Sequence, residues 1–335
     1  MSICTVISYH YVRKVFETRF PRIKALNLSS FREQIAYMKR FYIFVTAQDC
    51  IDAIYTKKKL PRNAALLTFD DGYSDHYMNV FPILDDAGIQ GCFFLPVSAV
   101  RDGRVLDVNK IHFILASVKN IDQLQLDIFD ILNRLRSEGY TIASNDDLYQ
   151  KLAIDGKCAE YLSFDSSQVV FIKQLLQREL TQDIRSSIID ELFKRYVTNN
   201  ELAFARELYL SEDQIHTMVR HGMIVGNHGY EHRWMNTLSA IEQKKEVESS
   251  NEFLQKFGMN LDNWLMCYPY GAYDASLQSI CTENGCSLAF TTEVGIAELK
   301  KENALTLPRL DTIHLPVHAN EKPNSWTQRE LDLAY

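Results

Sequence analysis

The stretch Ala65-Leu66-Leu67-Thr68-Phe69-Asp70-Asp71-Gly72 decides how this chain folds. A short apolar run that ends at a polar turn is typical of a buried strand in a parallel sheet, so we predict a strand over Ala65–Phe69. The residues that follow predict a helix from Asp75 to Ala87, which Gly88 ends in a left-handed conformation. Cys92–Leu95 predicts the next strand. The order strand, helix, strand indicates a parallel α/β fold.

The same alternation continues on both sides of this stretch. Three capping boxes, which begin at Ser30, Ser211 and Ser239, predict helix starts. Five further strands are predicted, at Thr5–Tyr9, Met223–Gly226, Leu265–Tyr268, Ser287–Thr291 and Leu305–Leu307. About seven strands separated by helices favour a parallel β/α sheet or barrel over a sandwich.

The alternation is interrupted once. Residues 105 to about 212 carry helical periodicities with little strand between them. We therefore expect one α/β domain over residues 1–318, split by a mostly helical insertion at about 105–212. Residues 319–335 are polar and are expected to form a C-terminal tail.

Composition excludes several classes of protein. The 335 residues carry 36 Lys and Arg against 43 Asp and Glu, a net charge of −7, which disfavours nucleic acid as a partner. The seven cysteines show no CxxC pair, so neither a disulfide framework nor a cysteine zinc site is expected. The chain has no apolar run long enough for a transmembrane segment and no signal-like N-terminus. We expect a soluble, cytoplasmic protein, and the sequence leaves the oligomeric state open.

Three polar clusters follow predicted strands, where the carboxyl ends of barrel strands gather. They are Asp70-Asp71-Gly72, the segment Gly226-Asn227-His228-Gly229-Tyr230-Glu231-His232, and Tyr268-Pro269-Tyr270-Gly271. Each alone is weak, because a bare Asp-Asp-Gly is more often a solvated turn. Together they offer one aspartate and two histidines, a ligand set that leaves positions open on a catalytic metal ion. A second carboxylate beside that set can act as a general base.

These clusters resemble the motifs of the NodB-type polysaccharide deacetylases, carbohydrate esterase family 4. Thr68-Phe69-Asp70-Asp71-Gly72 is similar to their first motif, His228-Gly229-Tyr230-Glu231-His232 to their His-x-x-x-His motif, and Cys267-Tyr268-Pro269-Tyr270-Gly271 to their Arg-x-Pro-Tyr-Gly motif. Tyr9-His10 and Leu307-Pro308-Arg309 resemble flanking segments of the family. The resemblance spans about residues 1–100 and 210–315.

The resemblance implies a distorted (β/α)7 barrel and one divalent metal ion. That ion would be zinc, with cobalt, nickel or manganese as alternatives. It implies Asp70 as general base, Asp71, His228 and His232 as metal ligands, and the backbone N–H of Tyr270 as an oxyanion donor. The implied reaction removes an N-acetyl or related acyl group from a sugar. Without an export signal, we expect the substrate to be an N-acylated sugar or glycan precursor.

The chain departs from the family pattern in two places. Cys267 stands where the family has an arginine that orients the base, and we hypothesise that Arg309 replaces it. The general acid is ambiguous: His314 is our candidate, ahead of His318 and His10. Further substrate contacts are predicted from the residues around the motifs, namely Tyr73, Trp234, Tyr268, Pro269 and His10.

Two alternatives remain open at this stage. The first is a catalytically impaired member of the same fold that binds carbohydrate or regulates. The second is a metalloprotease, because His228-x-x-Glu231-His232 matches a His-x-x-Glu-His pattern with Glu231 as base. That pattern needs a helix, whereas Gly229 and the preceding strand favour a loop.

Overall fold

The computed structural model describes residues 2–154 and 165–333. The chain divides into two compact units, and each is described by itself. The first, here called the barrel unit, consists of residues 1–14, 25–104 and 205–335. The second, here called the helical unit, consists of Val15–Lys24 and Val105–Phe204.

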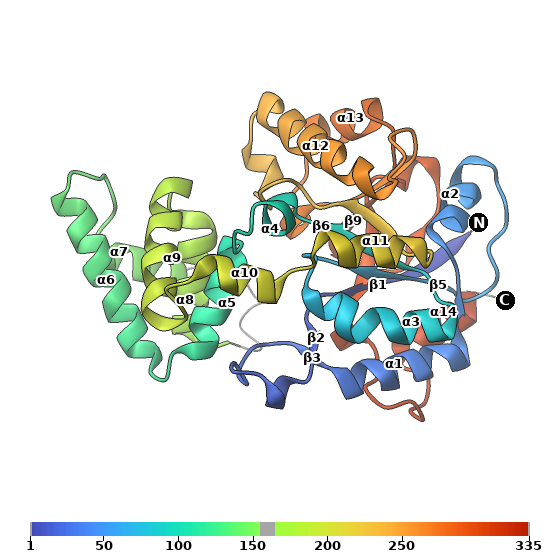
Figure 1. The fold of residues 1–335 in the computed structure, drawn as a ribbon, viewed down its shortest axis with the longest axis horizontal. Helices are drawn as coiled ribbons and strands as arrows, with labels where there is room; N and C mark the ends of the chain where they lie inside the picture. Colours follow the sequence, from blue (N-terminus) through green and yellow to red (C-terminus); the bar gives the residue numbers. More distant parts are fainter. Residues whose placement is uncertain (1, 155–164, 334–335) are drawn as a thin grey trace. The chain divides into compact units, whose positions relative to one another are not determined.

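Seven parallel strands form the wall of the barrel unit (Figure 1). In chain order they are β1 (Ile3–Tyr9), β5 (Ala64–Phe69), β6 (Gly91–Leu95), β7 (Ile224–Asn227), β8 (Trp264–Cys267), β9 (Cys286–Val294) and β11 (Leu307–Asp311). Their hydrogen-bonded order is β1-β11-β9-β8-β7-β6-β5, and β5 pairs again with β1. This second pairing closes the ring, so the predicted (β/α)7 barrel is confirmed.

The pleat of β5 separates the core into two apolar layers. Leu67 and Phe69 belong to the cluster that packs against the surrounding helices, together with Phe31 of helix α1 (Leu28–Phe41). Leu66 belongs to a second cluster, made mainly of side chains from the other barrel strands. Since alternate residues of a strand face opposite sides, Thr68 points to the same side as Leu66. The carboxyl end of β5 thereby directs polar groups into the barrel.

Helices cover the outside of the barrel. In chain order after α1 they are α2 (Ala47–Tyr55), α3 (Phe81–Ala87), α4 (Val97–Arg101), α11 (Glu212–Arg220), α12 (Ala240–Leu254), α13 (Ala275–Glu283) and α14 (Ser325–Leu333). Two-residue strands extend the ring: β4 (Ile43–Phe44) pairs with β5, and β10 (Ala297–Glu298) pairs antiparallel with β1. A further short pair, β2 (Val12–Arg13) and β3 (Leu26–Asn27), lies outside the barrel.

Local capping signals predicted most helix ends but not all. The capping boxes at Ser211 and Ser239 are both formed, and Gly88 ends α3 with φ of 64°. The predicted start at Ser30 is wrong, because α1 begins earlier. Its N-cap is Asn27, whose side chain accepts a hydrogen bond from the Ser29 N–H.

The helical unit contains α5 (Asp107–Ser117), α6 (Ile121–Ser137), α7 (Asn145–Tyr149), α8 (Ser167–Gln174) and α9 (Gln182–Tyr196), while α10 (Glu201–Leu208) crosses its boundary. Phe113 and Phe204 pack edge-to-face at its centre, with ring centroids 4.9 Å apart. Phe20 contacts both rings, which explains why the segment Val15–Lys24 belongs to this unit. No pattern in the sequence predicted that Val15–Lys24 would pack with the helical unit.

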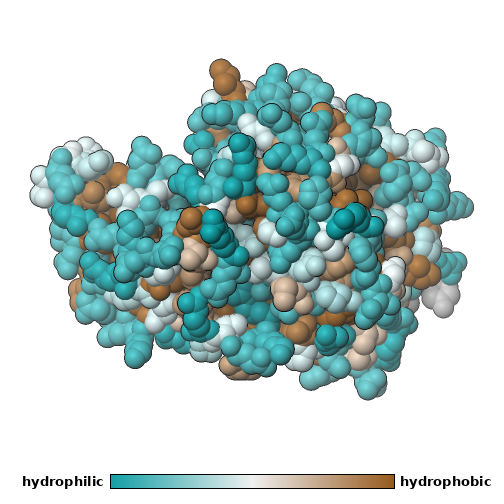
Figure 2. Space-filling model, viewed as in Figure 1, coloured by the Kyte–Doolittle hydropathy of each residue, from teal (hydrophilic) through white to brown (hydrophobic). Residues whose placement is uncertain are grey.

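The C-terminal segment is more structured than a polar tail. It contains α14, whose Trp326 packs against the helix-facing apolar cluster of the barrel unit. In the face shown in Figure 2, hydrophilic residues cover most of the surface. Within residues 2–154 and 165–333, every helix is too short or too polar to cross a membrane.

Candidate active site

Two adjacent aspartates follow β5 and point in different directions. Asp70 contacts Arg309 and Cys267, whereas Asp71 contacts the two histidines of the second motif. A left-handed backbone at Asp71, with φ of 73°, separates the two carboxylates. Non-glycine residues rarely adopt this conformation, which is found most often where function requires it. The two carboxylates can therefore take different chemical roles.

Asp71, His228 and His232 form a compact, buried set of possible metal ligands. Their candidate ligand atoms all lie within 4.8 Å of one another. The Nε2 atoms of His228 and His232 lie 3.4 Å and 3.3 Å from Oδ1 of Asp71. These distances are close enough for one small cation to touch all three atoms.

The hydrogen bonds around this set leave the ligand atoms available. The Nδ1–H of His228 donates to the Cys267 carbonyl at 2.7 Å, which leaves the lone pair on Nε2. The Tyr73 hydroxyl donates to Oδ2 of Asp71 at 2.5 Å. Oδ1 of Asp71 is buried without a hydrogen-bond partner among the described residues, a costly state that a bound cation would relieve. The residues present thus fit a divalent metal ion with two nitrogen ligands and one oxygen ligand.

The second motif forms a loop that neighbouring side chains hold in shape. Glu246 of α12 is buried and accepts hydrogen bonds from the N–H groups of Tyr230 and Glu231, at 2.7 Å and 3.0 Å. Asn227 accepts from the Gly229 N–H at 2.7 Å. His232 adopts a left-handed backbone with φ of 54°. Because this segment is not helical, it lacks the geometry that the metalloprotease alternative requires.

Arg309 of β11 forms a two-pronged ion pair with Asp70. Its two terminal nitrogens donate to the two carboxylate oxygens at 3.0 Å and 2.8 Å. The guanidinium is fixed in turn by Thr68 Oγ1 and by the Thr291 carbonyl, each at 3.0 Å. The Cys267 thiol also donates to Asp70, at 3.4 Å. The planar guanidinium of arginine can donate two parallel hydrogen bonds to one carboxylate, which no other side-chain cation can do. These two bonds fix the orientation of Asp70.

The charge state of Asp70 follows from these partners. Burial raises the pKa of Asp70, but the charge of Arg309, the hydrogen bonds from Arg309 and the nearby His228 and His10 together keep the pKa below the ordinary value of 3.8. Burial lowers the pKa of His232 below 6.5, even though Asp71 opposes this shift. The site therefore offers an ionised carboxylate beside a neutral imidazole, the form of histidine that binds metal ions.

Aromatic rings form one wall beside the ligand set. The Tyr270 ring stacks on Trp234 with centroids 4.3 Å apart and an interplanar angle of 1°, and it lies 4.7 Å from the His232 ring. Tyr270 is left-handed, with φ of 58°, which sets the direction of its backbone N–H. Gly271 must follow it, because a Cβ there would lie 2.2 Å from Thr292 Oγ1. Such a wall can pack against the apolar face of a sugar ring.

The structure separates the candidate histidines. Nε2 of His10 lies 3.8 Å from Oδ2 of Asp70, and the His10 side chain is 47% exposed. The contacts of His314 within the described residues lie elsewhere: its Nδ1 accepts from the Asp311 N–H at 3.0 Å, and its ring faces Trp326. Of the histidines considered as general acid, His10 is the one brought to Asp70.

Three predicted substrate contacts lie in the interior instead. Tyr73 is fully buried and supports Asp71, so it cannot line the mouth of a pocket. Tyr268 is 1% exposed, and its hydroxyl donates to the Leu305 carbonyl. Pro269 is buried as well. The three substrate contacts stay predictions, since a strand end read from sequence does not show which side chains pack inward.

Sequence reasoning missed several supporting residues. Besides Glu246 and Asn227, the buried His76 donates from Nε2 to the His10 carbonyl at 3.0 Å. Burial lowers the pKa of His76 to about 4, so it is neutral. None of the three was predicted from sequence to have a functional role. The only sequence signal for Glu246 is that it is a polar residue at a position of the helix that faces the apolar core.

The comparisons with known proteins show the family of this chain. The family model described as polysaccharide deacetylase matches residues 57–147 and 159–289. The chain belongs to the polysaccharide deacetylase family. In a stretch of 79 residues it is 39% identical to the poly-beta-1,6-N-acetyl-D-glucosamine N-deacetylase of Escherichia coli strain K12. That stretch covers 23% of this chain but only 12% of the Escherichia coli protein.

Solved deacetylase structures share the fold of this family member over nearly their whole length. The Streptococcus pyogenes deacetylase PplD, solved in complex with acetate, aligns with a TM-score of 0.54 at 15% identity, covering 98% of this chain and 97% of that one. IcaB from Ammonifex degensii aligns with a TM-score of 0.53 at 18% identity, covering 99% and 97%. At these identities the similarity establishes the fold alone.

Proposed function

We propose that this polysaccharide deacetylase family member is a divalent metal-dependent N-deacetylase, in which Asp71, His228 and His232 hold the metal ion. The observation that carries the proposal is their convergence on one point beside Asp70 and Arg309. A cation bound there would supply Lewis acidity, which polarises an amide carbonyl and acidifies a water molecule.

In this proposal Asp70 is the general base. Its low pKa keeps it ionised, and Arg309 holds it in one orientation, so it can accept the proton of a water molecule that attacks the amide carbon. The resulting negative charge on the carbonyl oxygen needs a hydrogen-bond donor. We assign the backbone N–H of Tyr270, whose ring lies beside the His232 ring, to that position.

The leaving amine needs a proton, and we assign His10 as its donor. An imidazole can carry and release a proton near neutral pH. His10 is half exposed, faces Asp70 and is held through its carbonyl by His76. This assignment replaces our first candidate, His314.

We propose an N-acetylated amino sugar as the substrate, presented as a polymer or as a glycan precursor. The stacked Trp234 and Tyr270 rings favour a sugar ring over a peptide. The name of the Escherichia coli relative suggests β-1,6-linked N-acetylglucosamine oligomers as the first compounds to test.

The Asp70–Arg309 pair favours an active enzyme over an impaired binding protein. The absence of the family arginine at Cys267 motivated that alternative. A guanidinium from β11 now reaches the same carboxylate, and a protein that only binds sugar has no need of a precisely oriented buried base.

Two measurements on the same proteins test the proposal: the divalent metal content of the purified chain, and acetate release from N-acetylglucosamine oligomers. We expect about one ion per chain in the wild type. Asp71→Asn and His228→Ala should lose both metal and activity, whereas Asp70→Asn should keep the metal and lose acetate release. A wild type that binds no zinc, cobalt, nickel or manganese would refute the metal site. Acetate release by Asp70→Asn at the wild-type rate would refute the base.

A further inference from the structure

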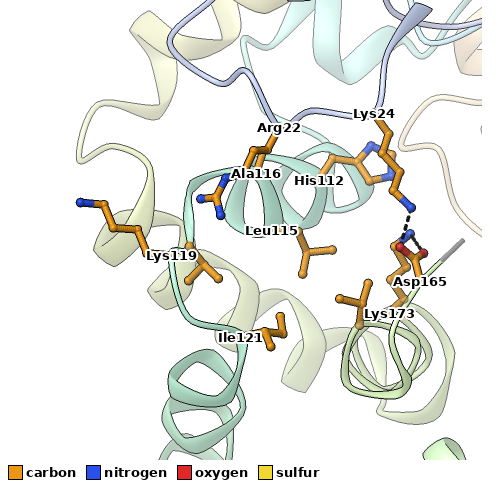
Figure 3. A pocket seen from close by; sticks show the side chains of 11 residues that line it. Arg22, Lys24, His112, Leu115, Ala116, Lys119, Ile121, Asp165 and Lys173 are labelled. Carbon is orange, nitrogen blue, oxygen red and sulfur yellow. Dashed lines mark hydrogen bonds and ion pairs between the residues drawn. The ribbon is translucent and has the colours of Figure 1, made fainter.

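The helical unit contains a cavity of about 320 Å³ that the proposed deacetylation does not use. It lies between the segment Val15–Lys24, helix α5, the start of α6, and α8 (Figure 3). All of its lining residues belong to the helical unit. A volume near 300 Å³ is at the lower end of the range for small-molecule sites, so it suits a ligand about the size of a sugar phosphate.

The charged groups around this cavity are mostly positive. Among the described residues, its lining includes four cations, Arg22, Lys24, Lys119 and Lys173, against the single carboxylate of Asp165, a surplus of three positive charges. The chain as a whole carries a net charge of −7, so this surplus is local. A concentration of positive charge around a concave site raises the local concentration of anions.

Asp165 organises one side of the cavity. Its two oxygens accept hydrogen bonds from Lys24 and Lys173, at 2.5 Å and 2.7 Å, and Figure 3 shows both lysines converging on it. Its side chain is only 8% exposed. One carboxylate shared by two ammonium groups leaves a net positive charge on that side, with the lysines fixed in place.

Two further cations lie on the other side. Neither Arg22 nor Lys119 has a hydrogen-bond or ion-pair partner among residues 2–154 and 165–333, and both are exposed. Leu115 and Ile121 lie between the charged sides (Figure 3), Val169 also lines the cavity, and all three are half-buried. These apolar side chains do not stabilise a hydrated inorganic ion, but they can bury the carbon skeleton of an organic anion.

We propose that this cavity binds a small phosphate monoester, with the phosphate near Arg22 and the organic part on the floor of Leu115, Ile121 and Val169. An arginine fork matches phosphate oxygens, and a dianion offsets most of the surplus charge. The cavity is thus a second ligand site, separate in its residues from the metal-binding set.

Calorimetric titration of the full chain with glucose 6-phosphate, glucose and inorganic phosphate tests this proposal. Glucose 6-phosphate has no N-acyl group, so it is not a substrate of the proposed deacetylation. The Asp71→Asn variant, which should lack the metal, serves as the host protein and excludes binding of phosphate at the metal. We expect glucose 6-phosphate to bind with a dissociation constant below about 1 mM, and more tightly than either glucose or phosphate.

Two matched double variants locate the site. Arg22→Gln with Lys119→Gln should weaken binding at least about tenfold, because two of the positive charges around the cavity are lost, among them the arginine next to the proposed phosphate. Lys57→Gln with Lys59→Gln removes the same charge from an exposed loop of the barrel unit and should leave binding unchanged. Absence of binding at about 1 mM, equal weakening by both double variants, or equal affinity for inorganic phosphate would each overturn the proposal. None of these results depends on the outcome of the deacetylase assay.

Discussion

At the scale of single residues, the proposed chemistry depends on how Asp70 is oriented. In this chain Asp70, the proposed base, is held by Arg309, 239 positions away in sequence, rather than by a residue of the third motif. The thiol of Cys267 remains in contact with the base, but burial raises the pKa of Cys267, so it is a neutral donor. A neutral thiol cannot balance the buried charge of Asp70, which leaves that task to the guanidinium.

The first prediction concerns this pair. Arg309→Ala should lower kcat for acetate release by at least about 100-fold, because Asp70 loses both its orientation and the charge that keeps it ionised. Arg309→Lys should lower kcat about tenfold, since a lysine keeps the positive charge but cannot form the two parallel hydrogen bonds. Metal content, measured in parallel, should stay near one ion per chain. An Arg309→Ala protein with full activity would show that Asp70 needs no such partner.

The second prediction separates two histidines. His10→Gln should lower kcat by about 100-fold, as expected for the loss of a general acid, with little change in KM. His314→Gln should retain nearly full activity, because the side chain of His314 contacts Asp311 and Trp326. The reverse result, with His314 essential and His10 dispensable, would return the acid role to His314.

At the scale of elements, α12 fixes the shape of the histidine loop. Glu246 gives the N–H groups of Tyr230 and Glu231 a buried acceptor, and the loop in turn sets the spacing of His228 and His232. The left-handed backbone at His232 is costly, and such conformations persist only where the surroundings determine them. The helix therefore supports the candidate metal ligands without supplying one of them.

The third prediction follows from that contact. Glu246→Ala should weaken zinc affinity by about 10- to 100-fold, the usual effect of losing a residue that supports metal ligands. Glu248→Ala is the matched control, because Glu248 lies on the same helix with its side chain 49% exposed. Competition with a zinc-binding dye measures both variants. Equal affinity in the two variants would mean that the loop holds its shape without α12.

At the scale of the whole molecule, segments from both ends of the chain build the barrel unit. The hydroxyl of Thr327, in α14, lies 2.8 Å from the Tyr37 hydroxyl and accepts from the Tyr42 hydroxyl at 3.0 Å. All three residues are buried. The last helix is thus part of the fold of the barrel unit, and two buried tyrosine hydroxyls form hydrogen bonds with it.

The fourth prediction tests whether the hydrogen bonds of α14 stabilise the barrel unit. Thr327→Val should lower the free energy of unfolding by about 1 to 3 kcal/mol, the cost of leaving buried hydroxyl groups without a partner. Thr282→Val, at an exposed position of α13, should change it by less than about 0.5 kcal/mol. Urea denaturation followed by circular dichroism measures both. A stability equal to that of the wild type would show that α14 contributes no hydrogen bonding to the core.

The sequence by itself determined the order of strands and helices, the class of fold and the residues that converge at the ligand set, although it placed the last barrel strand at Leu305–Leu307 and the structure has it at Leu307–Asp311. These features are local: an apolar run sets a strand, and the carboxyl ends of parallel strands share one rim. Thr68-Phe69-Asp70-Asp71-Gly72 and His228-x-x-x-His232 could therefore be interpreted without coordinates. The role of Arg309 could only be a hypothesis from sequence. A local sequence pattern does not show which side chains of two different strands are in contact.

Only the tertiary structure decided the partners of these residues. The pairing of β1 with both β5 and β11 closes the ring, and this closure brings His10, Asp70 and Arg309 together. Packing of the phenylalanines decided that Val15–Lys24 joins the helical unit and helps to line its basic cavity. Such contacts depend on strand register and on side-chain packing between distant segments. Neither produces a repeating pattern of residues from which it could be predicted.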